Sequence, residues 1–318
     1  MNVVFCGTGA FGVPALHALV LAGMRPKLVV TQPDRPAGRK RELKASPVKE
    51  AALALGLPLF QPERINREEA LSVLRAEAPD VLVVVAYGQI LRRAVLDLPR
   101  KGCVNLHGSI LPRHRGASPI AAAIAAGDLE SGVAAMLMDE GLDTGPVLGV
   151  VREAVRPDDD TGRLHDRLAA LGAPLLVAAL QDLAAGRAKP MPQDDGLATV
   201  CRTLSRDDSR LDWTKPAVVL ERLVRAMRPW PGAWTTLVRE NGPPTELGIT
   251  ESAVVGALPP TPPNPIPGTV LRADPDALIV AAGEGALRLL AVKPAGKTQM
   301  DAAAFVRGRQ IAAGDVCR

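Results

Sequence analysis

Three polar side chains of this sequence have types that suit proton transfer and oxyanion stabilisation. Asn105 and His107 lie two positions apart in the apolar run C-V-N-L-H (103–107), and Asp143 lies between glycines in G-L-D-T-G (141–145). Alternate side chains of a strand point to one face, so the amide and the imidazole are expected side by side. An amide N–H and an imidazolium can donate to an oxyanion, and a carboxylate can orient the imidazole and accept a proton. A lone Asn or His at a strand end more often forms a turn or is a hydrogen-bonded core group. The surrounding motif must therefore distinguish a catalytic role from a structural one.

The longer motifs around these side chains resemble the signature of the formyltransferases that use 10-formyltetrahydrofolate. N-L-H-G-S-I-L-P-R-H-R-G begins at Asn105, and G-L-D-T-G follows around Asp143 in the expected order. The resemblance implies that Asn105, His107 and Asp143 form the catalytic set. It also implies that 10-formyltetrahydrofolate is the co-substrate. The four histidines of the sequence lack the spacing of metal ligands, so no metal is expected.

Two segments are expected to contact the folate, because each follows an expected strand, where open α/β sheets bind their ligands. The residues are Ser109, Ile110, Leu111 and Pro112 in one segment, and Tyr87, Gly88 and Gln89 in the other. The second segment resembles the one that lines the pterin pocket in the family, and a plain turn is its alternative interpretation. Arg113, His114 and Arg115 are expected at the surface or on the side that faces the RNA. The family commonly shows an aromatic residue in place of His114, so we assign that position no role.

A basic segment lies early in the chain. Residues 35–49 contain six Lys/Arg and a single acid, Glu42, and the prolines and glycine of 31–45 predict an exposed loop. P-D-R-P-A-G-R followed by S-P-V-K resembles the tRNA-contacting insertion of the family. The resemblance implies that the formyl acceptor is the α-amine of initiator methionyl-tRNA, and that the tRNA is bound by Arg39, Lys40, Arg41 and Lys44. An ordinary solvated loop is the alternative.

The glycine-rich turn G-T-G-A-F-G (7–12) suggests a different class of enzyme. It matches the dinucleotide-binding fingerprint, which also needs an acid at the end of the second strand to hold a ribose hydroxyl. The second expected strand (27–31) ends in Thr-Gln-Pro, and the first acid, Asp34, comes late. We therefore expect a tight strand-to-helix turn without a nucleotide. An NAD-linked oxidoreductase stays as the alternative.

Other functions share the catalytic motif. They are formyl transfer to a nucleotide-sugar amine or to a purine precursor, and hydrolysis of the formyl donor. The basic segment argues against all three, as does a C-terminal region that holds all three tryptophans (213, 230 and 234). A catalytically idle RNA-binding module is a further alternative, which the complete Asn/His/Asp set argues against.

The order of elements predicts a doubly wound α/β domain with a mostly parallel sheet, formed by residues 1–187. Expected strands are 2–6, 27–31, 57–60, 80–86, 102–107, 132–138 and 146–151. Helices alternate with the strands, and a long amphipathic helix from Thr161 to about residue 185 closes the domain. The run D-V-L-V-V-V-A (80–86) is apolar on both faces, which is typical of a central parallel strand.

Beyond residue 187 the composition changes. Residues 188–207 are expected to form a polar linker, and 208–318 a smaller β-rich, OB-like domain that supports tRNA binding. A helix is expected at 217–227, and a proline-rich irregular segment at 242–268. Three short strands are expected at 268–271, 277–281 and 286–292.

The composition indicates a cytoplasmic protein. Of the 318 residues 47% are hydrophobic, which is typical of a globular chain, and the net charge of +4 would not by itself imply a nucleic-acid partner. Met1 leads directly into N-V-V-F-C-G, so no signal peptide and no membrane association are expected. The four cysteines lie far apart and are expected to be reduced thiols. We also expect a monomer.

Overall fold

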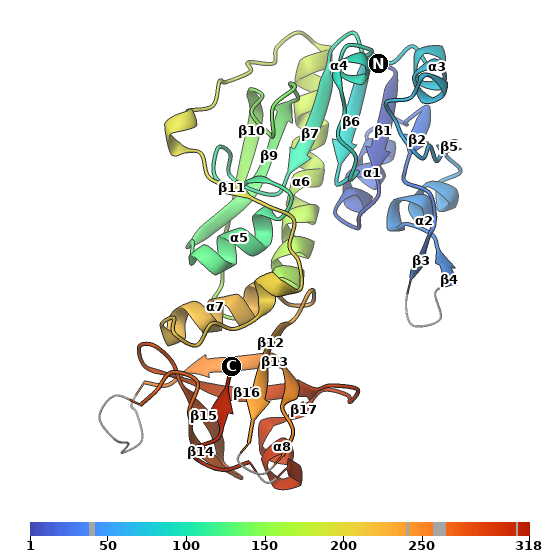
Figure 1. Ribbon diagram of the computed structural model, residues 1–318. Coiled ribbons are helices and arrows are strands. Elements are labelled where there is room, and N and C mark those ends of the chain that lie inside the picture. The colour runs from blue at the N-terminus through green and yellow to red at the C-terminus, as the bar shows by residue number, and fades with distance from the viewer. Residues whose placement is uncertain (38–41, 240–241, 257–264, 310) are drawn as a thin grey trace. The chain divides into compact units, whose positions relative to one another are not determined.

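The computed structural model describes residues 1–37, 42–239, 242–256, 265–309 and 311–318, which divide into two compact units (Figure 1). The first unit comprises Met1–Pro119, Glu130–Ala154 and Leu164–Arg202. The second comprises Ile120–Leu129, Val155–Arg163 and Thr203–Arg318. Each unit has its own main sheet and its own hydrophobic core.

The first unit is built on a seven-stranded sheet in the order β10-β9-β7-β6-β1-β2-β5 (Figure 1). Its strands are β1 (Val3–Gly7), β2 (Leu28–Val30), β5 (Leu59–Phe60), β6 (Val81–Val85), β7 (Cys103–His107), β9 (Glu130–Leu137) and β10 (Val147–Ala154). Its helices are α1 (Gly12–Leu21), α2 (Pro47–Ala54), α3 (Glu68–Ala76), α4 (Arg93–Leu96) and α6 (Thr161–Ala184). The strands from β7 to β5 are parallel, and β9 is antiparallel to both β7 and β10. The predicted doubly wound, mostly parallel fold is therefore confirmed.

Both faces of this sheet are covered, which explains why V-L-V-V-V of β6 is buried at every position. On one face a single cluster joins strand residues to α3 and α4: Val4, Cys6, Val84, Cys103, Leu71, Leu74 and Val95. On the other face α6 crosses β7 and β9 at Gly172. A Cβ at Gly172 would lie 3.0 Å from the side chains of Leu106 and Val133, so the close approach of helix and sheet depends on this glycine.

Helix α6 is long and apolar enough to cross a membrane by length and composition alone. Its fully buried leucines are Leu164, Leu168, Leu176 and Leu180, whose spacing places them along one stripe of the helix. Arg163, Asp166 and Arg167 lie in the first turns of the same helix. A buried stripe of this kind also occurs in the core helices of globular domains, which pass the same test of length and composition.

The second unit is built on an antiparallel sheet in the order β14-β15-β16-β13-β12-β18, with β17 beside β16. Its strands are β12 (Ala233–Val238), β13 (Thr245–Val254), β14 (Val270–Asp274), β15 (Ala277–Ala281), β16 (Ala286–Pro294), β17 (Met300–Asp301) and β18 (Val316–Cys317). Its helices are α5 (Pro119–Ala126), which joins this unit from Ile120, α7 (Ala217–Ala226) and α8 (Ala302–Arg309). A bridge between Thr269 and Val316 joins the start of β14 to β18, at the opposite end of the order. The sheet therefore nearly closes on itself, which confirms the predicted OB-like, β-rich domain.

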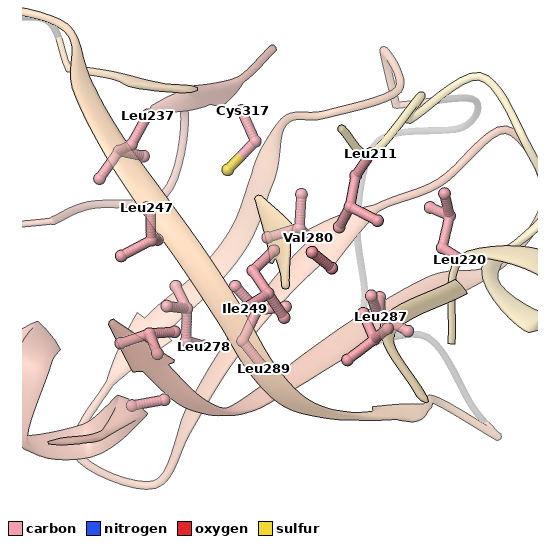
Figure 2. Close-up of a cluster of buried hydrophobic side chains, with 14 of the residues drawn as sticks. Leu211, Leu220, Leu237, Leu247, Ile249, Leu278, Val280, Leu287, Leu289 and Cys317 are labelled. Atoms are coloured by element: carbon pink, nitrogen blue, oxygen red, sulfur yellow. The ribbon is translucent and has the colours of Figure 1, made fainter. Parts of the chain in front are cut away.

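Alternating residues of these strands fill the core of the second unit (Figure 2). Labelled examples are Leu247 and Ile249 of β13, Leu278 and Val280 of β15, and Leu287 and Leu289 of β16. Trp213 joins the same core, and its indole N–H donates to Thr235 Oγ1 at 2.9 Å. A buried indole needs such a partner, so this tryptophan has a structural role.

The structure contains strands that the sequence did not predict, among them β12, β17 and β18 of the second unit. Within the expected irregular segment 242–268, Thr245–Val254 forms β13, because Leu247 and Ile249 alternate into the core while the prolines lie outside the strand. Within the expected loop 31–45, β3 (Arg35–Ala37) and β4 (Glu42–Lys44) pair as an antiparallel two-stranded ribbon. Local proline and glycine content indicates a turn, but it does not reveal a pairing partner across the turn.

Candidate active site

Strand β7 places Asn105 and His107 on one face of the first sheet. Asn105 pairs in register with Met136 of β9, and His107 pairs with Ala134. His107 is only 6% exposed, whereas Asn105 is half-buried. Within the described parts of the chain, the Asn105 amide makes no hydrogen bond to another group. It is therefore available to a ligand.

His107 faces a hydrogen-bond acceptor at each ring nitrogen. Its Nε2 lies 2.9 Å from the carbonyl oxygen of His114, and its Nδ1 lies 3.6 Å from Asp143 Oδ2. A carbonyl oxygen can only accept, so Nε2 carries a proton. A proton on Nδ1 as well would place an imidazolium beside the Asp143 carboxylate, in a site where both groups are largely buried. The structure thus brings together the histidine and the aspartate of the candidate set.

The turn that carries Asp143 is held in a fixed conformation. Asp143 has φ +54°, in the left-handed region that non-glycine residues rarely adopt, and its Oδ2 accepts a hydrogen bond from Gly116 N at 2.8 Å. Asp139 Oδ1 accepts from Thr144 Oγ1 at 2.6 Å within the same turn. A Cβ at Gly145 would collide with the carbonyl oxygen of Leu137. Gly145, the last residue of G-L-D-T-G, is therefore required, because the backbone at Leu137 leaves no room for a side chain.

The expected folate segment after β7 folds over the same face of the sheet. Leu111 packs with Ala134 and Met136, the two β9 residues that pair with His107 and Asn105. Ser109 Oγ donates to the carbonyl oxygen of Arg113 at 2.6 Å and closes the turn, and the Leu111–Pro112 peptide bond is cis. The segment thus borders the catalytic candidates.

The expected folate segment after β6 divides into a buried and an accessible part. Tyr87 is 2% exposed, and burial raises the pKa of its phenol, so the group stays neutral. Gln89 uses its side chain inside the protein, accepting from Ile65 N at 2.9 Å and donating to Glu63 O at 3.2 Å. Gly88 and Gln89 line a pocket, whereas Tyr87 packs in the core.

This pocket has a volume of about 610 Å³ and is strongly basic. Its lining residues are Gln32, Arg35, Glu63, Arg64, Asn66, Arg67, Gly88, Gln89, Ile90 and Arg92. In the described part of the chain, no acidic side chain forms an ion pair with any of the four arginines. They come from segments that follow β2, β5 and β6, and these strand ends meet at one edge of the sheet. Sequence reasoning missed this cluster. The sequence did contain an indication of it, because arginines follow each of the three expected strands 27–31, 57–60 and 80–86.

The expected tRNA-binding residues fall partly outside the described structure. Lys44 lies exposed in β4, whereas Arg39, Lys40 and Arg41 lie outside the described residues. Arg35, on the paired strand β3, lies opposite Lys44 in the register of the ribbon. The ribbon therefore carries basic side chains on both of its strands.

The backbone amides of the glycine-rich turn after β1 are hydrogen-bonded within the protein. Thr8 N and Gly9 N both donate to the carbonyl oxygen of Ala86, at 3.2 and 3.1 Å. In a dinucleotide site such amides would face the pyrophosphate. Asp34, the late acid, pairs with Lys49 at 2.6 Å and has a lowered pKa because of that contact. Neither half of the dinucleotide fingerprint is therefore in place.

The surface position expected for His114 and Arg115 is wrong. They are 7% and 6% exposed, respectively. Strand β8 (Arg115–Gly116) pairs in parallel with β11 (Val200–Cys201), a segment from far along the chain, and this pairing covers the loop. A long-range pairing of two such short strands leaves no periodic pattern in the sequence. Elsewhere in the described residues, no group of three or more His, Cys, Asp or Glu side chains could hold a metal ion.

The fold and these motifs agree with the family comparison. Residues 1–180 match the formyl transferase family, and residues 203–310 match the formyl transferase C-terminal domain. This protein belongs to the formyl transferase family.

Its relatives indicate a particular branch of that family. The chain is 49% identical to a methionyl-tRNA formyltransferase of Acidithiobacillus ferrooxidans and 50% identical to one of Halorhodospira halophila. Each alignment covers 99% of this chain and 98% of the relative. A methionyl-tRNA formyltransferase of Neisseria meningitidis is 46% identical, with 99% of both chains covered.

Solved structures support the fold at lower identity. A sugar 3N-formyltransferase, WlaRD, crystallised with dTDP and 5-N-formyl-THF, superposes with a TM-score of 0.64 at 15% identity, covering 94% of this chain and 99% of that one. HypX from Aquifex aeolicus in complex with tetrahydrofolic acid gives a TM-score of 0.61 at 16% identity. The match to HypX covers 96% of this chain and spans 47% of the longer HypX chain.

Proposed function

We propose that this protein transfers the formyl group of 10-formyltetrahydrofolate to the α-amine of initiator methionyl-tRNA. The product is N-formylmethionyl-tRNA for translation initiation. The end-to-end similarity to methionyl-tRNA formyltransferases supports this acceptor. The observation that carries the chemistry is the largely buried His107–Asp143 pair, with Asn105 on the same strand as His107 and without a hydrogen bond from its side chain within the described residues.

In the proposed reaction a bond forms between the α-amine nitrogen and the formyl carbon. The resulting tetrahedral centre carries an oxyanion, which Asn105 stabilises by donating an N–H and His107 stabilises with the charge of its imidazolium. Asp143 keeps the imidazole protonated and takes up the amine proton, directly or through a water. The bond between the formyl carbon and the folate nitrogen then breaks, and that nitrogen takes up the proton that Asp143 had accepted, directly or through a water.

Folate binding is assigned to the two segments at the strand ends. Ser109, Ile110, Leu111 and Pro112 border the reacting groups, and Gly88 and Gln89 lie on the wall of the basic pocket. Tyr87 supports this wall from the core. Because the glutamate tail of a folate carries carboxylates, the arginines of the pocket provide suitable partners for it.

tRNA binding is assigned to Arg39, Lys40, Arg41 and Lys44, together with the second unit. Lysines and arginines bind nucleic acid mainly through phosphate contacts, and Lys44, the described member of this set, is exposed. We further propose a catalytic domain of residues 1–187, a linker of 188–207 and a tRNA-supporting domain of 208–318. The protein would act as a monomer in the cytoplasm.

The direct test is to incubate the protein with 10-formyltetrahydrofolate and charged initiator tRNA and to assay for formylmethionine. A nucleotide-linked amino sugar serves as the competing acceptor. Formylation of methionyl-tRNA alone supports the proposal. Formylation of the sugar alone, or hydrolysis of the donor without transfer, would replace it.

A further inference from the structure

The segment from Gln193 to Cys201 contacts the turns that carry the candidate catalytic side chains, although it lies in the stretch expected to be a linker. Gln193 Nε2 donates to the carbonyl oxygens of Asp143 and Gly145, at 2.8 and 2.7 Å. An amide nitrogen has two hydrogens, and each finds one acceptor here. The side chain therefore ties together both sides of the turn that presents the Asp143 carboxylate.

Arg115 fixes the orientation of the Gln193 amide. Its Nε and Nη2 donate to Gln193 Oε1 at 3.1 and 2.9 Å, and Nη2 also pairs with Asp195 Oδ1 at 2.7 Å. The guanidinium is buried, whereas the Asp195 carboxylate is exposed. Because Oε1 faces donors and Nε2 faces acceptors, only one orientation of the amide satisfies every contact.

The same segment shapes the loop on the other side of the pair. Thr199 O accepts from Arg115 N, and Thr199 Oγ1 accepts from His114 N, both at 2.8 Å. Gly116 has φ +114°, and a Cβ there would collide with the carbonyl oxygen of Cys201. This loop supplies the His114 carbonyl to His107 Nε2 and the Gly116 amide to Asp143 Oδ2.

We propose that Gln193 is a positioning residue for formyl transfer. It holds Asp143 in its left-handed conformation and, with the β8–β11 pairing, fixes the separation of Asp143 and His107. This inference rests on the proposed catalytic roles of those two residues. Gln193 acts through the Asp143 turn and is not among the residues that line the basic pocket, so its loss should lower kcat and leave both KM values unchanged.

Two substitutions separate the contacts of Gln193. Gln193→Ala removes all of them. Gln193→Glu keeps an acceptor for Arg115 but puts a carboxylate oxygen against the carbonyls of Asp143 and Gly145. Both variants should lose about 10- to 100-fold in kcat, the effect expected of a small misplacement of a reacting group. The matched control is Gln181→Ala, since Gln181 is exposed on α6.

The experiment combines turnover with a measurement that does not need activity. Steady-state formylation is measured for the Gln193 variants in the wild-type and Asp143→Asn backgrounds, and hydrogen exchange of the Gly116 amide is followed by NMR. We expect faster exchange at Gly116 in Gln193→Ala but not in Gln181→Ala. In the Asp143→Asn background we expect Gln193→Ala to lower kcat by less than about twofold. The effects of two substitutions are not additive when one residue acts through the other.

Unchanged exchange at Gly116, full activity of Gln193→Glu, or fully multiplicative losses in the double variant would each overturn the positioning role. A selective rise in the KM for tRNA would overturn it too, because Gln193 would then be a substrate contact. Wild-type turnover of Asp143→Asn alone would remove the catalytic role of Asp143, and with it the basis of this inference. That failure of the proposed function is recognised without any Gln193 variant.

Discussion

The carboxyl ends of β1 and β7 are both followed by a turn that contains glycine. The two ends differ in whether their polar groups are hydrogen-bonded within the protein. After β1, Thr8 N and Gly9 N are bonded to the carbonyl oxygen of Ala86. At the end of β7, the Asn105 amide has no hydrogen-bond partner in the part of the chain described, and His107 faces Asp143. The dinucleotide-like motif is thus used to hold the sheet together. In the proposed function, by contrast, the Asn105 amide and His107 act on the substrate.

The same contrast separates the arginines of the first unit. Arg115 is buried and bonded to Gln193 and Asp195, so its charge is used inside the protein. Arg64 and Arg67 line an open pocket, where no carboxylate of the described residues pairs with them. We therefore expect Arg115 to matter for geometry and the pocket arginines for affinity.

The largest expected effect follows from replacing His107. His107→Ala removes the charge proposed to stabilise the oxyanion, so kcat should fall by ~10²–10⁴ while the folate Kd stays nearly constant. Asn105→Ala and Asp143→Asn should cause losses of similar size. Steady-state kinetics with methionyl-tRNA and calorimetry with the folate give the two quantities. The control is His17→Ala, on the exposed side of α1, and near-normal turnover of His107→Ala would contradict the assignment.

Local sequence pattern predicted the parallel sheet, the long helix α6 and the strands β15 and β16, because each has an apolar run of the right period and length. The pattern also placed Asn105 and His107 on one strand. It did not reveal the β8–β11 pairing, which joins residues 85 positions apart. Nor did it reveal the basic pocket, which forms only when three strand ends meet. Contacts between short, distant segments depend on the tertiary fold. The contact of Gln193 with the Asp143 turn is an example next to the candidate site.

A smaller effect is expected from the basic segment 35–49 of the sequence. Arg39→Ala should weaken use of methionyl-tRNA by about 1–3 kcal/mol, the range for a lost charge-assisted contact. The folate Kd should not change. The slope of log affinity for tRNA against log salt should become shallower by about one unit, because one phosphate contact is lost. Binding titrations at several salt concentrations measure this, with Lys27→Ala as an exposed control of equal charge change. Identical slopes for Arg39→Ala and the wild type would make the basic segment an ordinary solvated loop.

The pocket arginines should give a smaller change, confined to the folate. Arg67→Ala should raise the KM for 10-formyltetrahydrofolate about three- to tenfold with kcat unchanged, because an exposed guanidinium is partly screened by solvent. The control is Arg93→Ala, whose side chain pairs with Asp97 on the surface of α4. A folate analogue without the glutamate tail gives a sharper test, since the wild type and Arg67→Ala should then have equal KM values for it. A persistent difference would mean that Arg67 affects the pocket without contacting the tail.

The smallest effect on activity is expected at the glycine-rich turn. A Cβ at Gly7 would lie 2.6 Å from the Phe5 ring and 3.0 Å from the carbonyl oxygen of Val85, so Gly7→Ala should destabilise the first unit by about 1–3 kcal/mol through overpacking. Formylation per folded molecule should stay at the wild-type value, because the turn contacts no substrate in this proposal. Urea unfolding followed by circular dichroism measures the loss. The fluorescence of Trp213, Trp230 and Trp234 reports the second unit alone, since all three lie there. Calorimetry with NAD should show no binding to the wild type. Tight NAD binding that Gly7→Ala abolishes would show that the amides of this turn can leave Ala86 for a ligand, and the contrast between the two strand ends would then fail.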